Sequence, residues 1–189
     1  MQSQETCFFN PLYEVAIVIN SSLNPQVVFQ KVVEQVAKAL SCKACTLRLL
    51  DRSGKYLLAS ASYGLSKGYL RKGQVELMKS AIDSDVLTFA KPVYMGDVSE
   101  DAARFQYPDA AKAEGIVSIL VVPLLVDRKP VGVLRIYTDS MREFTQNEQD
   151  FLMAVSHVAA IAIDNARLHE SLRSDYELLT QYNYQVFED

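Results

Sequence analysis

Tryptophan is absent from this chain of 189 residues, and cysteine, glycine and histidine are scarce. Three cysteines are too few for a disulfide framework, and free thiols are typical of a reducing compartment, which predicts a cytoplasmic protein. The formal net charge is −4 and no basic cluster is present, which excludes a general nucleic-acid-binding protein. No apolar run reaches the roughly 20 residues that cross a bilayer, and no signal peptide is readable, so we expect no membrane insertion.

Motifs of catalysis and metal binding are also missing. There is no glycine-rich phosphate loop, no G-x-S-x-G elbow and no acid pair in a catalytic context, so we do not expect an enzyme. Cys42 and Cys45 form C-x2-C without a second pair of ligands, which excludes a zinc site. They are either a redox pair or, as we favour, two thiols of which one is buried. His157 and His169 lie twelve residues apart on one expected helix and do not share a face, so we expect neither metal nor haem.

Local patterns in the first part of the chain predict two helices and a hairpin. Asn10 and Asn24 each precede a proline, which is the arrangement of an N-cap followed by the first helical residue. Apolar residues then recur at helical spacing, and two alternating segments flank a turn cluster. The expected elements are helices over about 11–22 and 25–41 and strands over 44–50 and 56–63.

The second part begins with a weakly periodic region, residues 64–92. A stretch of this length without firm structure is often functional. The capping box Thr145–Glu148 opens a last helix that no later proline or glycine interrupts. Between them we expect a strand over 93–98, a helix over 101–114 capped by Ser99, and strands over 116–126 and 131–138.

This order of elements predicts an α+β fold. An antiparallel sheet of five or six strands would carry helices from both chain ends on one face, with the loop-and-helix insertion on the other. Pro123 lies inside an apolar strand, so we expect a local irregularity there.

Several segments resemble a known family when their order and spacing are taken together. They are KPVYMGDVSED (91–101), GIVSILVVPL (115–124), PVGVLRIYT (130–138), FTQNEQDFL (144–152) and AIAIDNARL (160–168). Over about residues 12–170 the chain is similar to the GAF domain family of small-molecule-sensing modules in signalling proteins. The resemblance implies a ligand pocket on one sheet face, a helical dimerisation side on the other, and a host such as a sensor histidine kinase.

Three branches of that family are disfavoured by departures from their patterns. Cyclic-nucleotide-binding members carry an Asn-Lys-Phe-Asp-Glu signature, which Phe144 and Glu148 match only in part, because Gln149 replaces the last acidic residue. A covalent bilin needs a cysteine, and none follows Thr46. The free methionine sulfoxide reductases need cysteines in their middle loops, which are also missing.

The hairpin near residue 128 predicts which side chains line the pocket. A loop at 127–130 would place Val122 opposite Arg135 and Leu120 opposite Tyr137. The wholly apolar face would then pack on the helices, and the mixed face would line a small-molecule site. The apolar face would consist of Ile119, Val121, Gly132, Leu134 and Ile136.

Two arginines, Arg48 and Arg135, would meet on the mixed face. They would suit a carboxylate or phosphate, although solvated or salt-bridged arginines are the commoner case, with Asp51 or an acid of the insertion as partner. Phe105 and Tyr107 would form a lid, or alternatively pack as ordinary aromatic residues. The predicted ligand-binding residues are Thr46, Arg48, Tyr94, Phe105, Tyr107, Ser118, Leu120, Val122, Arg135 and Tyr137.

The last helix carries a heptad pattern that predicts a homodimer through the terminal helices. A packed core helix and an effect of truncation are the alternatives. We expect a disordered N-terminus (1–10), a GAF-like domain (11–170) and a helical extension (171–189) linking to an output domain. The seam consists of Val155, Ala162, His169, Tyr176 and Asn183 at a, and Val158, Asn165, Leu172, Leu179 and Val186 at d.

The sequence therefore predicts a sensory or regulatory domain that binds an unidentified small molecule and relays its presence through dimeric helices. The alternative is a structural dimerisation module with a filled pocket and no ligand.

Overall fold

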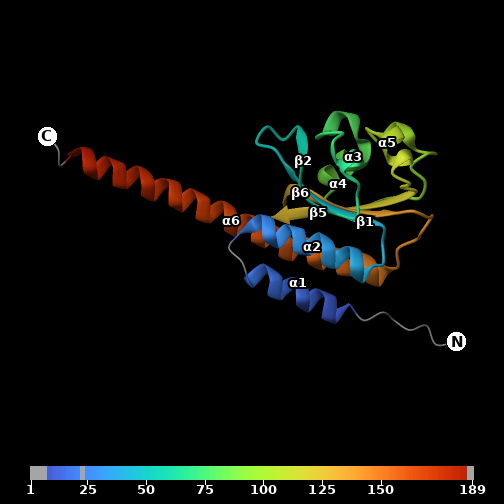
Figure 1. Ribbon diagram of the computed structural model, residues 1–189, viewed down its shortest axis with the longest axis horizontal. Coiled ribbons are helices and arrows are strands. Elements are labelled where there is room, and N and C mark those ends of the chain that lie inside the picture. The colour runs from blue at the N-terminus through green and yellow to red at the C-terminus, as the bar shows by residue number, and fades with distance from the viewer. Residues whose placement is uncertain (1–7, 22–23, 187–189) are drawn as a thin grey trace.

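A six-stranded antiparallel sheet separates two layers of helices in the computed structural model of the chain, which describes residues 8–21 and 24–186 (Figure 1). The strand order is β3-β2-β1-β6-β5-β4. The α+β fold is as predicted, and the first hairpin agrees to the residue. The strands are β1 (Ala44–Leu50), β2 (Tyr56–Tyr63), β3 (Val75–Glu76), β4 (Val93–Met95), β5 (Ser118–Val126) and β6 (Lys129–Thr138).

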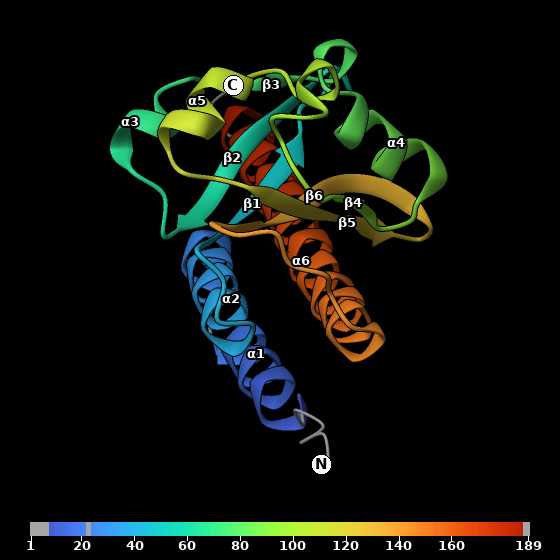
Figure 2. The same ribbon diagram turned by 90° about the vertical axis from the view of Figure 1, so that its right-hand side faces the viewer.

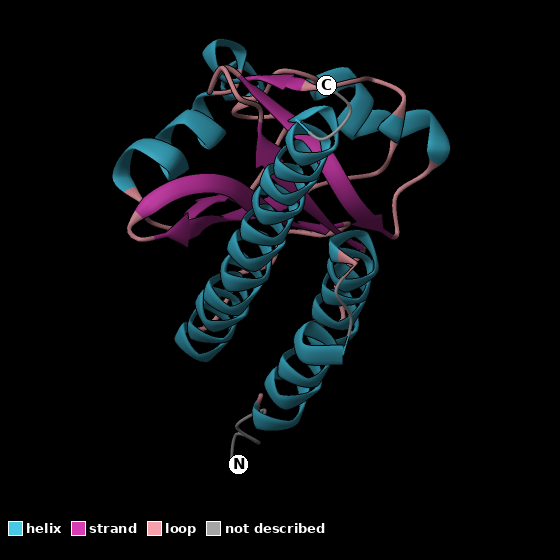
Figure 3. Ribbon diagram, turned by 90° about the vertical axis from the view of Figure 1, so that its left-hand side faces the viewer, coloured by secondary structure: helices cyan, strands magenta, loops and turns pink. Residues whose placement is uncertain are grey.

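Helices from both ends of the chain cover one face of the sheet, as predicted (Figure 3). They are α1 (Phe9–Ser21), α2 (Pro25–Ala39) and α6 (Gln146–Val186). Their apolar sides pack against alternate residues of the central strands, among them Leu47 and Leu134. This layer forms one of the two cores of the molecule.

Two of the four predicted helix starts are confirmed. Asn24 caps α2 by accepting from the Gln26 N–H at 3.0 Å. At α6 the Thr145 N–H donates to Glu148 at 2.8 Å, and the Glu148 N–H donates to the Thr145 hydroxyl at 3.3 Å. The start at Asn10 is wrong: α1 begins at Phe9, so residues 9 and 10 are helical.

The insertion covers the opposite face (Figure 2). Two predictions fail here. Residues 64–92 hold regular elements, and the helix expected over 101–114 is broken because the residue before Pro108 disfavours helical backbone. Ser99 caps no helix; its N–H and hydroxyl both donate to Asp97. The elements of this cover are α3 (Lys67–Leu70), η1 (Leu77–Lys79), α4 (Ala81–Phe89), η2 (Ala102–Arg104) and α5 (Pro108–Ala113).

The register of the β5–β6 hairpin differs from the prediction by one residue. Asp127 and Arg128 both have positive φ, 47° and 64°, and form a two-residue turn. A register shift between Leu124 and Leu125 then offsets the remaining pairs. Val121 therefore lies opposite Arg135, so β5 presents the face opposite to the predicted one.

Helix α6 is 41 residues long, and its C-terminal part projects well beyond the sheet (Figure 1). Residues 187–189, the end of the predicted extension, lie outside the described residues. Among the helices that the structure describes, none combines the length and apolar character of a membrane span.

Candidate ligand-binding site

Two arginines meet on the sheet face beneath the cover. Arg48 on β1 and Arg135 on β6 belong to paired strands, where Thr46 lies opposite Arg135 and Arg48 opposite Val133. Both guanidinium groups are almost wholly buried, at 1% and 0% exposure. The predicted set Thr46, Arg48, Arg135 and Tyr137 thus shares one face, and the hydroxyls of Thr46 and Tyr137 lie 3.2 Å apart.

Arg135 has a carboxylate partner in the cover. Its Nε donates to Asp83 Oδ1 at 2.8 Å and its Nη2 to Asp83 Oδ2, and Ser80 also donates to this carboxylate. Burial is the largest single influence and lowers the pKa of Arg135, but the charge and hydrogen bonds of Asp83, together with the hydroxyls of Tyr137 and Tyr69, outweigh it, and the pKa rises. The expected salt-bridge partner in the insertion is therefore Asp83, whereas Asp51 accepts from the backbone of its own turn.

Arg48 has no such partner. Its Nη1 donates to the Leu57 carbonyl at 3.4 Å, and its Nε has no hydrogen-bond partner among the described residues. The Nη1 of Arg135 is likewise buried and unpartnered. Buried donors are normally satisfied, so these two nitrogens mark a place where an acceptor is missing.

A lysine of the cover completes the charged group. The Nζ of Lys72 lies 3.3 Å from the ring centroid of Tyr69, 5.5 Å from that of Phe105 and 5.3 Å from that of Tyr107, and it has no hydrogen-bond partner among the described residues. The ring faces favour the ammonium form. Burial has the opposite and larger effect, followed by the charges of Arg135 and Arg48, and together they lower the pKa of Lys72 from 10.5 to about 6.

We call Arg48, Lys72, Asp83 and Arg135 the cationic cluster. It holds three basic groups and one acid. When Lys72 is neutral, the two positive charges of the arginines still exceed the single negative charge of Asp83. An unpaired buried charge costs several kcal/mol, roughly, so this excess favours an anion at the unpartnered donors. Forked guanidinium donors suit carboxylate and phosphate oxygens.

The cover is tied down around the cluster. The Ser66 N–H donates to Glu114 at 2.7 Å, and the Tyr107 hydroxyl donates to the Gln74 carbonyl at 2.9 Å. Phe105 is buried, with its ring centroid 5.6 Å from the Arg135 guanidinium carbon. Phe105 and Tyr107 therefore lie above the cluster, in the position predicted for a lid.

Four predicted ligand-binding residues lie elsewhere, three of them because of the register shift. Leu120 and Val122 belong to the core beneath the terminal helices. Ser118 lies two residues before Leu120 on the same strand face, and its hydroxyl hydrogen-bonds the Thr138 hydroxyl and the Ser140 carbonyl. Tyr94 pairs with Leu120 and places its ring 6.0 Å from that of Phe144, which is part of the same core. None of the four reaches the cationic cluster.

The sequence prediction missed Tyr69, Lys72 and Asp83. All three lie in residues 64–92, which showed no clear periodicity. Asp83 follows Ile82, and Ile82 and Val86 are both buried on α4. That spacing of two apolar residues was the only available sign of the helix that presents the acid.

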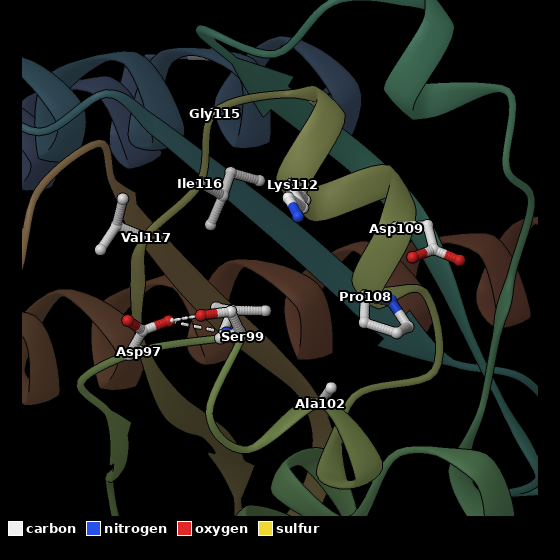
Figure 4. Close-up of a pocket in the computed structure, with 10 residues that line it drawn as sticks. Asp97, Ser99, Ala102, Pro108, Asp109, Lys112, Gly115, Ile116 and Val117 are labelled. Carbon is white, nitrogen blue, oxygen red and sulfur yellow. Dashed lines mark hydrogen bonds between the residues drawn. The ribbon is translucent and has the colours of Figure 1, made fainter.

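A cavity of about 420 Å³ lies between the segment that follows β4 and α5 with the residues after it (Figure 4). Its charged side chains, Asp97, Asp109 and Lys112, are of mixed sign, and it contains no predicted ligand-binding residue. Val98 and Ile116 connect it to the core that holds Phe105. The lining residues are Asp97, Val98, Ser99, Ala102, Pro108, Asp109, Lys112, Gly115, Ile116 and Val117.

The two described cysteines fit the structural interpretation better than a redox pair. Cys45 is buried, and Cys42 is half-buried beside the carbonyls of Ala37 and Ala44. Burial raises the pKa of Cys42 to about 11, so the reactive thiolate is scarce at neutral pH. Among the side chains that the structure describes, no group of three or more metal-binding residues gathers.

Of the predicted seam positions on α6, Asn165 and Leu172 are exposed and Val158 is half-buried. Val155 is buried in the core beneath the helices, and Ala162 packs against that core. Of the other predicted positions, His169, Tyr176, Leu179, Asn183 and Val186 have side chains outside the described set. The exposed large apolar residues of α6 are Ile161, Leu168 and Leu172, and those of α1 are Phe9, Tyr13 and Ile17.

Comparison with known proteins agrees with this architecture. The GAF domain from the phosphoenolpyruvate-protein phosphotransferase of Acinetobacter is 25% identical, with a TM-score of 0.73 over 88% of this chain and 97% of that chain. The corresponding domain from Coxiella burnetii is 20% identical, with a TM-score of 0.78 over 89% and 99%. A domain assigned to a two-component sensor histidine kinase of Sinorhizobium meliloti 1021 is 20% identical, with a TM-score of 0.65 over 77% and 94%.

No curated protein matches the sequence. The family model of the GAF domain matches residues 22–164, which is most of the chain. The chain therefore belongs to the GAF domain family.

Proposed function

We propose that this chain is a non-catalytic sensory domain that binds a small anion at the cationic cluster. The observation that carries the proposal is Arg48, a buried guanidinium group with an unpartnered Nε and no carboxylate. Keeping such a charge out of water lowers stability, so a role in binding explains its presence better than a role in folding does.

The cluster is covered, so an anion must displace part of the cover to reach it. The segment that carries Tyr69 and Lys72 is the candidate for this displacement. Its ties to Glu114 and Tyr107 are hydrogen bonds, which can break without disrupting the apolar core. Ligand binding would then shift the balance between a closed and an open arrangement of this segment.

The sheet offers a short route from the cluster to the terminal helices. Arg48 and Arg135 alternate along their strands with Leu47 and Leu134, which belong to the core under α2 and α6. A small displacement of β1 or β6 would therefore act on both layers at once.

We further propose that the chain acts as a homodimer through its terminal helices. The exposed residues Ile161, Leu168 and Leu172 of α6 follow spacings of seven and four, which suits a helix pair. On α1, Phe9, Tyr13 and Ile17 repeat every four residues and form a second exposed apolar line.

The host that we propose is a cytoplasmic signalling protein, most simply a sensor histidine kinase in which α6 leads to an output domain. The similar domain from Sinorhizobium meliloti supports the kinase, while the similar phosphotransferase domains suggest other hosts. The free thiols of Cys42 and Cys45, of which only Cys45 is fully buried, support this compartment.

A structural dimerisation module without a ligand is the second candidate. The complete burial of Arg135 and Tyr137 favours it, as does the position of the 420 Å³ cavity away from the cluster.

Native mass spectrometry of freshly purified protein separates the two candidates. We expect a retained small anion in the wild type and none in Arg48→Met, which keeps the size of the side chain but removes the charge. Protein that carries no added mass, and whose thermal stability responds to no anion in a broad panel, would support the structural module instead.

A further inference from the structure

The surplus of basic groups at the cationic cluster defines a class of ligand more closely than the proposed function does. We propose that the ligand is a small dianion, one end of which binds Arg48 and Arg135 while the other binds Lys72. This inference rests on the proposed function and adds a chemical class and a further binding residue to it.

The first negative charge belongs between the arginines. Arg135 uses Nε and Nη2 on Asp83 and keeps Nη1 free, and Arg48 keeps Nε free. Two free donors on neighbouring strands suit the two oxygens of one carboxylate or two oxygens of one phosphate. Asp83 already balances one guanidinium group, so a single anionic group balances the other.

The second negative charge belongs at Lys72. The two described acids that act on it are already engaged, because Asp83 is held by Arg135 and Ser80, and Glu114 accepts from Ser66. The Lys72 amine also lies over the aromatic rings of Tyr69, Phe105 and Tyr107. In its ammonium form the buried Lys72 group offers three donors, and none of them has an acceptor among the described residues.

Proton uptake should accompany binding. Arg48 and Arg135 face Lys72 as like charges and, after burial, are the next causes that lower its pKa to about 6, against Asp83 and Glu114, which raise it. The amine is therefore mostly neutral at pH 8 in the empty site. A second carboxylate beside it favours the ammonium form, so the site takes one proton from solvent when the dianion binds.

The experiment is isothermal titration calorimetry of the wild-type chain at pH 8, where dicarboxylic acids are fully ionised. The probes are succinate, glutarate and inorganic phosphate, with butyrate as the monoanion that matches succinate in carbon number. We expect at least one dicarboxylate or phosphate to bind about tenfold or more tightly than butyrate. Which of the probes binds distinguishes a dicarboxylate from a phosphate compound.

Three lysine variants test the role of Lys72. Lys72→Met should lose the preference for the dianion over butyrate. Lys72→Arg should keep that preference without proton uptake, because its charge is permanent. Lys79→Met, which removes an exposed lysine of the same cover, should behave as wild type in both respects.

Proton uptake is read from titrations in two buffers of different ionisation enthalpy. The wild type should take up on the order of one proton for each dicarboxylate bound, and Lys72→Met none. Thermal melting of each variant shows whether it is folded.

The dianion proposal is overturned if butyrate binds as tightly as succinate and glutarate, if Lys72→Met keeps the preference, or if none of the three dianions binds at millimolar concentration. These outcomes leave the proposed function intact as long as native mass spectrometry finds another retained anion. Absence of any retained or binding anion overturns both.

Discussion

At the scale of single residues, the two arginines on neighbouring strands of one sheet face should respond in opposite ways to substitution, one variant losing stability and the other gaining it. Arg135 is paired with Asp83, whereas Arg48 forms no ion pair with an acid among the described residues. Replacing Arg135 with methionine leaves a buried, unpaired carboxylate and should lower the free energy of unfolding by about 3–5 kcal/mol. Replacing Arg48 with methionine removes an uncompensated charge and should raise the free energy of unfolding of the protein without ligand.

Urea denaturation of both variants at neutral pH checks this pair. The double variant Arg135→Met with Asp83→Leu is the control, since it removes both charges and should recover most of the lost stability. An Arg48→Met protein that is less stable than wild type would show that this side chain is a structural residue.

Lys72 gives a prediction about pH. Its folded pKa of about 6 is lowered from 10.5 mainly by burial, so between these values the unfolded chain binds a proton that the folded chain does not. The free energy of unfolding should therefore rise with pH across this window, by at most about 1.4 kcal/mol per pH unit.

Denaturation between pH 6.5 and pH 8.5 measures that slope. The slope should be smaller in Lys72→Met and unchanged in Lys79→Met, because Lys79 is an exposed residue of the same cover. Equal slopes in all three proteins would mean that the Lys72 amine stays protonated in the folded state.

At the scale of elements, the sequence predicted the orientation of a strand's side chains correctly where polar and apolar residues alternate. In β1, Cys45 and Leu47 point to the helices and Thr46 and Arg48 to the cluster, so the pattern itself determines the face. β5 is apolar on both faces over Ile119–Leu125, and only the turn determined its register. A two-residue turn followed by a register shift was enough to reverse every side chain.

The partner of Arg135 was out of reach for a related reason. Asp83 belongs to α4, which ends at Phe89 and is followed by Ala90 in a left-handed conformation. A glycine is the usual residue at such a position, so the usual stop signal is missing from the sequence. The break before Pro108 was readable, since a residue before proline disfavours helical backbone, and the expected helix over 101–114 ignored it.

Gly132 tests how closely β1 and β6 must approach beside the cluster. A Cβ at this position would lie 2.2 Å from the Arg48 carbonyl oxygen, so alanine must push the strands apart. We expect Gly132→Ala to lower the free energy of unfolding by about 1–3 kcal/mol or more and to weaken anion binding, because Arg48 moves with its strand.

Gly68→Ala is the matched control. Gly68 lies in α3, and a Cβ there would meet the Ser66 hydroxyl at 3.6 Å, which is ordinary contact. Chemical denaturation should place this variant at or above wild-type stability, given the higher helix propensity of alanine. A Gly132→Ala protein as stable as the control would show that the two strands can separate freely.

At the scale of the whole molecule, the sheet joins two chemically different layers. One layer is an apolar core under helices from both ends of the chain, and the other contains the cationic cluster under a cover of short elements. Because α6 both packs on this sheet and projects beyond it, an event at the cluster can reach the far end of the helix without a separate linker (Figure 1).

That transmission needs a second chain for α6 to act against, which leads to the last prediction. Leu168 and Leu172 are 56% and 66% exposed within one chain, although both belong to the apolar line on α6. Glutamate at both positions would place like charges on the two sides of a helix pair. The dissociation constant of the dimer should rise by two orders of magnitude or more, about 2.8 kcal/mol, as measured by sedimentation equilibrium. Met78→Glu adds a charge at a residue that is 96% exposed on η1, away from these helices, and should leave the dimer intact. Wild-type protein that sediments as a monomer at high concentration would contradict the dimer, and with it the proposed use of α6 as the output.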